Sequence, residues 1–174
     1  MTGLLGAVLA GGQSSRFGSD KALAVYRGAP LLDHAVAGLA RWCDAVVVAG
    51  RDGGVPDWPE PGMGPLGGLA GALIHAQDQG FDAVLAVSVD AVLLPDDLLE
   101  RLAPGPSFVA DQPVVGLWPV SVIGIVQDIL RSEGRHSLRA LAERSDARAL
   151  RFSKPLANIN TRSDLDLLEN DHGL

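Results

Sequence analysis

The sequence has almost no cysteine and no long hydrophobic run. Cys43 is the single cysteine among 174 residues, which excludes an internal disulfide and any zinc site built from cysteines. We therefore expect a cytoplasmic protein. No apolar run approaches the roughly 18 residues of a membrane-spanning helix. The short apolar stretch at the N-terminus lacks the basic start and the length of a signal peptide, so no membrane partner is expected.

Positive charge is also in short supply. The chain has 14 Lys and Arg against 21 Asp and Glu, which gives a net charge of −7 and an isoelectric point near 4.9. This balance argues against nonspecific binding to nucleic acid. With 47% apolar residues, the chain can fill one sizeable core. We predict a single domain over residues 1–174.

Apolar runs of the β type alternate with helical spacing in the first half of the chain. The runs are Leu4–Leu9, Ala45–Val48 and Ala83–Val89. Between them, apolar residues recur every three or four positions at 32–39, after Pro30, and at 66–74. Continuous apolar strands that alternate with helices predict a doubly wound α/β fold, whose mostly parallel sheet has helices on both faces.

The second half of the chain is less regular. We expect two strands at 108–110 and 114–118, separated by a turn at Asp111-Gln112-Pro113. Helices are expected over 122–129, 138–144 and 165–168, with a strand at 149–152 between the last two. The longest irregular stretch is 50–64, and long loops in compact domains are usually functional or mobile.

A glycine loop follows the first predicted strand. Gly11-Gly12 lets backbone amides approach an anion, Ser14 can add a hydroxyl donor, and Arg16 and Lys21 supply positive charge. The spacing matches neither the dinucleotide fingerprint nor the P-loop. The alternative is a plain turn, but two basic residues within ten positions favour a phosphate-binding loop.

This loop carries a family resemblance. The stretch Leu9-Ala10-Gly11-Gly12-x-Ser14-x-Arg16-Phe17-Gly18-x-Asp20-Lys21 resembles the opening signature of nucleotidyltransferases with the nucleotide-diphospho-sugar transferase fold. Its Ala-Gly-Gly form, with aspartate before the lysine, is similar to that of the molybdenum cofactor guanylyltransferases; the related cytidylyltransferases more often read Ala-Ala-Gly. The resemblance implies nucleotide contacts at Leu9, Ala10, Gly11, Gly12, Ser14 and Lys21, and catalytic charge at Arg16 and Lys21.

Ligands of open α/β sheets bind beyond the carboxyl ends of the strands, where Asp90 ends the third apolar run. A carboxylate there can bind a hard cation or merely start a turn. In the family, this position holds the magnesium aspartate of an Asp-x-Pro motif, which implies Mg²⁺ at Asp90. The motif is incomplete here, since Val92 replaces the proline.

Asn158-Ile159-Asn160-Thr161 resembles the terminal Asn-x-Asn-Thr signature of the family. Two amides two residues apart lie on one side of an extended segment. The resemblance implies that Asn160 completes the metal shell and that Asn158 contacts the acceptor. Without the family, helix capping would be the simpler interpretation.

The base and the acceptor are assigned by the same resemblance. Gly64, Pro65 and Leu66 would flank the base and ribose, although these small residues could equally pack a helix on the sheet. An upstream acid, Asp57 or Glu60, would read guanine. The family asparagine after the second strand is replaced by Ala49-Gly50-Arg51-Asp52, so that contact is not carried over. On the acceptor side, the resemblance points to Gln112 and Arg135.

The resemblance implies transfer of GMP from GTP to the phosphate of molybdopterin, with release of pyrophosphate and without a general base. GTP and molybdopterin are the expected partners, together with molybdenum cofactor carrier or insertion proteins. A cytidylyl, sugar-phosphate or phospholactate transferase is the alternative within this class. Outside it, a catalytically weakened nucleotide-binding relative remains open, because the Asp-x-Pro proline is missing.

Overall fold

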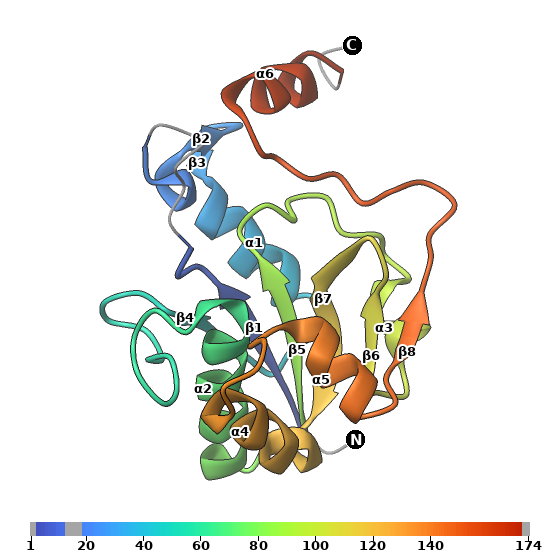
Figure 1. Cartoon of the computed structure of the whole chain (residues 1–174). Helices are drawn as coiled ribbons and strands as arrows, with labels where there is room; N and C mark the ends of the chain where they lie inside the picture. Colours follow the sequence, from blue (N-terminus) through green and yellow to red (C-terminus); the bar gives the residue numbers. More distant parts are fainter. Residues whose placement is uncertain (1–2, 13–18, 172–174) are drawn as a thin grey trace.

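The computed structural model describes residues 3–12 and 19–171 (Figure 1). Its strands are β1 Leu4–Leu9, β2 Val25–Tyr26, β3 Ala29–Pro30, β4 Ala45–Ala49, β5 Ala83–Ser88, β6 Ser107–Val109, β7 Gln112–Pro119 and β8 Arg148–Leu150. Its α-helices are α1 Leu31–Leu39, α2 Gly64–Gln79, α3 Leu98–Leu102, α4 Ile123–Arg131, α5 Leu138–Arg144 and α6 Arg162–Asp171. Two short 3₁₀ helices, η1 Lys21–Leu23 and η2 Val120–Val122, complete these elements.

Six strands form one mostly parallel sheet in the order β4-β1-β5-β7-β6-β8. β7 alone among them runs antiparallel to both of its neighbours. The first half of the chain follows its apolar pattern closely, because strands buried on both faces read as continuous apolar runs; β1 is buried along its whole length. The predicted doubly wound α/β fold is confirmed.

Helices cover both faces of the sheet. One core cluster joins alternate β1 residues such as Leu5 and Leu9 to α2, α4 and α5. The other joins Leu4 and Val8 to α1 and α3. This division follows from the two-residue period of a strand. In the described residues, no helix is long and apolar enough to cross a membrane.

Some details differ from the sequence expectation; β8, for example, ends at Leu150, whereas the strand was expected to reach residue 152. Gln112 and Pro113 belong to β7 rather than to a turn, because β6 and β7 are joined by only Ala110 and Asp111. The register shift opposite Val109 accommodates a proline that cannot donate to the ladder. The hairpin β2–β3 was not foreseen, since strands of two residues carry no periodicity.

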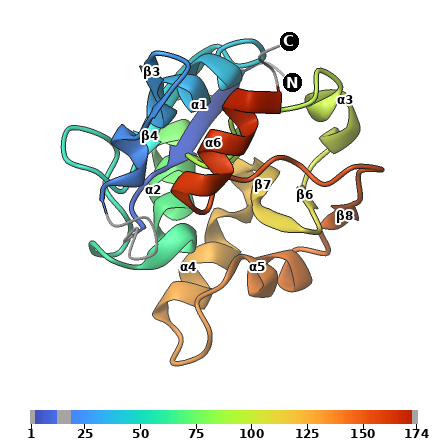
Figure 2. The same ribbon diagram turned by 90° about the horizontal axis from the view of Figure 1, so that it is seen from above.

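The last helix returns to the beginning of the chain. Residues 151–161 run along the top of the molecule in Figure 1, and α6 then lies beside the β2–β3 hairpin; Figure 2 shows α6 from above, at the end of the sheet where the parallel strands terminate. A small separate core between α6 and this hairpin contains Tyr26, Leu31 and Ile159. The C-terminal segment therefore borders the edge where ligands are expected.

Candidate active site

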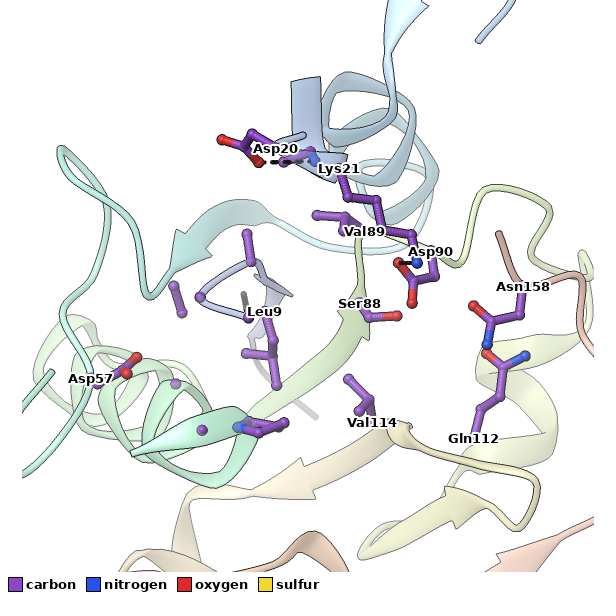
Figure 3. A pocket seen from close by; sticks show the side chains of 18 of the residues that line it. Leu9, Asp20, Lys21, Asp57, Ser88, Val89, Asp90, Gln112, Val114 and Asn158 are labelled. Carbon is purple, nitrogen blue, oxygen red and sulfur yellow. Dashed lines mark hydrogen bonds and ion pairs between the residues drawn. The ribbon is translucent and has the colours of Figure 1, made fainter. Parts of the chain in front are cut away.

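A pocket of about 370 Å³ opens at the carboxyl ends of the parallel strands (Figure 3). It lies between the loops that follow β1, β4 and β5, the start of α2 and the β6–β7 hairpin. The residues that line it are Leu9, Ala10, Gly11, Gly12, Asp20, Lys21, Ala22, Ala49, Asp57, Gly64, Pro65, Gly68, Ser88, Val89, Asp90, Asp111, Gln112, Val114 and Asn158. Most of the positions predicted from the sequence are thus brought together.

Lys21 and Asp90 form an ion pair in the middle of this pocket. The Lys21 Nζ is 2.7 Å from Asp90 Oδ1, and the side chains are only 12% and 22% exposed. Figure 3 shows Lys21 reaching from η1 to the carboxylate that follows β5. An ammonium at this distance neutralises the carboxylate as a bound cation would. Positive and negative charge needed for phosphate chemistry therefore meet at one point.

The loops after β1 and β4 approach each other at glycines. Gly50 has a φ of +80°, and a Cβ there would lie 2.8 Å from Gly11 Cα. Only glycine fits at this position, because both the backbone conformation and the space exclude a side chain. Gly12, in contrast, has open space where its Cβ would be. The Gly11-Gly12 backbone is therefore accessible from the pocket, as a phosphate-binding loop requires.

Asp57 lies on the opposite side of the pocket from Asp90 (Figure 3). Its Oδ2 accepts a hydrogen bond from the Gly62 amide at 3.1 Å, and its Oδ1 lies 3.0 Å from where a Cβ of Gly50 would be. Asp57 lines the pocket, whereas Glu60 is exposed and is not among the lining residues. Of the two acids weighed from the sequence, Asp57 is the one placed to meet a ligand.

The glycines of α2 serve two purposes. Gly64, Pro65 and Gly68 line the pocket, while a Cβ on Gly71 would lie 2.0 Å from the Pro56 carbonyl oxygen. Close packing therefore explains Gly71, whereas Gly64, Pro65 and Gly68 are placed where a ligand contact is possible. The N-cap residue Met63 makes no side-chain hydrogen bond, so no side chain caps the start of α2 at the pocket.

Some predicted residues fall elsewhere. Leu66 is fully buried in the core under α2, and Arg135 is exposed in the loop after α4; neither is among the lining residues. Arg135 is thus not brought to the pocket with Gln112 and Asn158. Ser14 and Arg16 lie outside the described residues, so their predicted contacts stay predictions.

Asn158 and Asn160 differ in their relation to the pocket. Asn158 lines the pocket near Gln112, but Asn160 does not. The Asn160 amide donates to Asp164 Oδ2 at 2.9 Å, at the start of α6. The structure does not bring Asn160 together with Asp90, and its metal contact stays an untested prediction.

Ser88 lines the pocket although it was not singled out from the sequence, and Asp20 and Asp111 line it although no role was assigned to them. Ser88 ends β5 two residues before Asp90, so its position was the available signal. Within the described residues, no three His, Cys, Asp or Glu side chains group as a metal site. Burial raises the pKa of Cys43 to about 12, which leaves this thiol unsuited to nucleophilic work at neutral pH.

The fold and this pocket define an α/β protein with a candidate ligand pocket at the carboxyl ends of its parallel strands. The chain matches the model of the MobA-like NTP transferase domain over residues 6–155 and belongs to that family. It is 32% identical to a molybdenum cofactor guanylyltransferase of Acidiphilium cryptum, covering 93% of this chain and 92% of that protein. It is 34% identical to the one from Rhodobacter capsulatus, covering 93% of each.

Solved structures agree on the fold. The molybdopterin-guanine dinucleotide biosynthesis protein A of Archaeoglobus fulgidus superposes with a TM-score of 0.74 at 20% identity, covering 96% of this chain and 97% of that one. A nucleotidyl transferase from Methanothermobacter gives a TM-score of 0.73 at 18% identity, with 98% of both chains covered.

Proposed function

We propose that this protein transfers GMP from GTP to the terminal phosphate of molybdopterin and releases pyrophosphate. The observation that carries the proposal is the pocket in which Lys21 pairs with Asp90 beside the Gly11-Gly12 loop, with Asp57 opposite. The names of the relatives in the same family supply the acceptor. We place the reaction in the cytoplasm, where the lone Cys43 stays reduced.

In this proposal, Asp57 reads the base. The N1 and N2 hydrogens of guanine are donors, and a carboxylate offers two acceptor oxygens for them. Asp57 is held in place by the Gly62 amide, so it is oriented before the ligand arrives. Cytosine and adenine do not present this pair of donors together. Such bases would leave a pocket acceptor unpaired, which is the basis for discrimination.

Mg²⁺ fits the oxygen groups of the pocket. Asp90 supplies one carboxylate, and Ser88 and Asn158 carry neutral oxygens on the same side. Mg²⁺ is commonly bound through one or two carboxylates together with substrate phosphates, and Lys21 shows that this carboxylate accepts a cation at 2.7 Å. When bound, the ion polarises phosphoryl oxygens and offsets their charge.

The chain's own residues supply positioning and charge. An oxygen of the acceptor phosphate attacks the α-phosphorus, a new P–O bond forms, and the bond to the β-phosphate bridge breaks with pyrophosphate leaving. The attacking phosphate is already ionised near neutral pH, so no general base is needed. Lys21 offsets triphosphate charge, while the Gly11-Gly12 amides hold the phosphates in line.

Gln112 and Asn158 form the acceptor side in this proposal. They line the pocket across from Asp57 and near Asp90 (Figure 3), so a phosphate that contacts them would lie on the Asp90 side. Arg135 would reach the acceptor only through parts of it that extend outside the pocket. Delivery of molybdopterin by a carrier protein, or its transfer to an insertion protein, belongs to the same proposal.

The test is calorimetric titration of the protein with GTP, CTP, ATP and UTP in Mg²⁺, followed by the product mass with molybdopterin present. We expect GTP to bind at least about tenfold more tightly than CTP or ATP, roughly 1.4 kcal/mol, and a product heavier than molybdopterin by GMP. CTP binding equal to or tighter than GTP would replace this proposal with a cytidylyltransferase. GTP binding without product would indicate the weakened relative.

A further inference from the structure

We propose that Arg51 is a positioning residue for the transfer reaction, which acts through Asp20 to hold Lys21 on the phosphate side of the pocket. The inference rests on the proposed function. Arg51 stands in the loop after β4 where the family asparagine is missing, and it is not among the residues that line the pocket. Its guanidinium instead binds Asp20, which does line the pocket.

The contact between Arg51 and Asp20 is bidentate. Nη1 donates to Asp20 Oδ1 at 2.9 Å, and Nη2 donates to Oδ2 at 2.5 Å. Two parallel bonds between a planar guanidinium and a carboxylate fix direction as well as distance. They also hold the pKa of Asp20 below its ordinary value, so the carboxylate is charged throughout the neutral range.

Asp20 in turn positions the short helix that carries Lys21. It is the N-cap of η1, where its Oδ1 accepts from the Ala22 amide at 3.2 Å. Lys21 is the first residue of η1, and its ammonium reaches Asp90. A change in the direction of the Asp20 carboxylate would thus rotate the turn that carries Lys21. The contacts therefore connect Arg51 in the β4 loop to Lys21 and Asp90, where the proposed reaction takes place.

The Arg51–Asp20 pair also joins the loops that follow β1 and β4, which would flank the donor nucleotide. The strands before them are tied by the Ala10 amide to the Ala49 carbonyl at 3.0 Å, and the loops touch where Gly11 meets Gly50. Arg51 and Asp20 add a second connection further along both loops. Two connections hold the spacing of the loops, whereas one would act as a hinge.

Charge gives Arg51 a second effect. Asp20 lies on the pocket wall, and an unpaired carboxylate there would repel a triphosphate. Arg51 neutralises it. The pair contributes little to folding, since the Asp20 side chain is 43% exposed and exposed ion pairs are worth little to stability. Its effect is therefore expected in nucleotide binding rather than in the melting temperature.

The experiment compares GTP binding, in Mg²⁺, of wild type, Arg51→Ala and Arg51→Lys by calorimetry, with melting temperatures alongside. We expect Arg51→Ala to weaken binding about tenfold at an unchanged melting temperature. Arg51→Lys should recover only part of this, because an ammonium cannot make both bonds in one plane. The control is Arg41→Ala, which removes a similar surface pair with Asp96 at 2.6 Å, away from the lining residues.

A double variant separates the route through Lys21 from a direct contact. If Arg51 acts through Lys21, then Arg51→Ala added to Lys21→Ala should cause a smaller further loss of affinity than Arg51→Ala causes in wild type, because only the repulsion by the unpaired Asp20 carboxylate is left. Losses that multiply in full would overturn the inference, as would an unchanged affinity of Arg51→Ala. Failure of the proposed function is seen in wild type alone: preference for CTP or absence of product with molybdopterin would reject that function, and absence of any GTP binding would overturn the inference as well.

Discussion

Asp90 is the residue on which the proposed chemistry depends most. Asp90→Asn keeps the size of the side chain but removes the charge that would offset a divalent ion, so we expect transfer to be abolished. Pyrophosphate release at limiting Mg²⁺ measures this. The melting temperature serves as the control, because the carboxylate is a pocket group whose loss should leave the fold intact. Turnover at the wild-type rate would remove Asp90 from the metal site.

Lys21 provides the complementary charge. Lys21→Ala should cost about 2–4 kcal/mol of transition-state stabilisation, comparable with the loss of one preorganised electrostatic donor. The measurement is kcat/KM for GTP. Lys21→Arg should restore only part of the rate, since a planar guanidinium does not replace a compact ammonium. A catalytic efficiency equal to that of wild type in Lys21→Ala would show that Lys21 only neutralises Asp90.

Sequence patterns predicted single residues best where strand ends determine position. Asp90 and Gly11 come directly after buried runs, and topology alone brings them to one pocket. Arg51 shows the limit, because its contact with Asp20 joins residues that are distant in the sequence and leaves no local signal. The contact of the Asn160 backbone amide with Asp164 spans only four residues and agrees with helix capping, the interpretation that the sequence offered without the family.

At the level of elements, the glycines of α2 let the helix pack closely against the loop that carries Asp57. Gly71→Ala would place a Cβ 2.0 Å from the Pro56 carbonyl oxygen, so the loop that carries Asp57 must shift. We expect a loss of about 1–3 kcal/mol of stability from overpacking, together with a smaller preference for GTP over CTP. Thermal melting and calorimetric titration measure the two effects.

Gly124 is the matched control for that substitution. It also lies in a helix, α4, but it is exposed and nothing stands within 4 Å of its Cβ position. Gly124→Ala should therefore stabilise the protein by about 0.5–1 kcal/mol and leave nucleotide preference unchanged. Equal effects of both substitutions would mean that Gly71→Ala changes only the helix propensity and that the contact with Pro56 has no effect.

α6 begins with a capping box. Asp164 Oδ2 accepts from the Thr161 amide at 2.8 Å, and Thr161 Oγ1 accepts from the Asp164 amide at 3.1 Å. The Asn160 amide, first, and then Thr161 lower the pKa of Asp164 below its ordinary value of 3.8. A lowered pKa means that the contribution of the carboxylate is complete above pH 3.8 and is lost as the pH falls further, through the folded-state pKa.

The direction of the pKa shift of Asp164 can be tested by amide hydrogen exchange. Amide protection factors of α6 in wild type should fall as the pH drops below 3.8, whereas those of Asp164→Ala should already be low near neutral pH and change little in that window. The amides of β1, in the main core, serve as the control. Protection of α6 that is equal in the variant and wild type at neutral pH would contradict the assignment.

For the molecule as a whole, nucleotide binding should appear as added stability. At a GTP concentration 100 times its Kd, binding is expected to raise the free energy of unfolding by about 2.7 kcal/mol. This corresponds to a rise of about 5–10 °C in Tm for a domain of this size. CTP at the same concentration should give roughly half the shift if it binds tenfold more weakly. Equal shifts for both nucleotides would argue against guanine recognition by Asp57.

The overall fold could be predicted because most elements carry a clear period. β1 and α5 have the bounds that the apolar pattern suggested. The β2–β3 hairpin escaped detection, although Arg27 and Gly28 both have positive φ, as a tight hairpin turn requires. The β6–β7 connection was misjudged because the register of a hairpin depends on its loop, which the apolar pattern does not encode.

The reversed strand β7 has a consequence for how such a protein can change over time. It marks the boundary between β4, β1 and β5, whose loops hold the glycine pair and Asp57, and the other half of the sheet, in which β7 itself carries Gln112. Under the proposed function, a new acceptor can therefore be accommodated by altering the β6–β7 hairpin, while the strands and loops that would hold the donor nucleotide are inherited unchanged. The same donor half would in this way serve descendants with different second substrates.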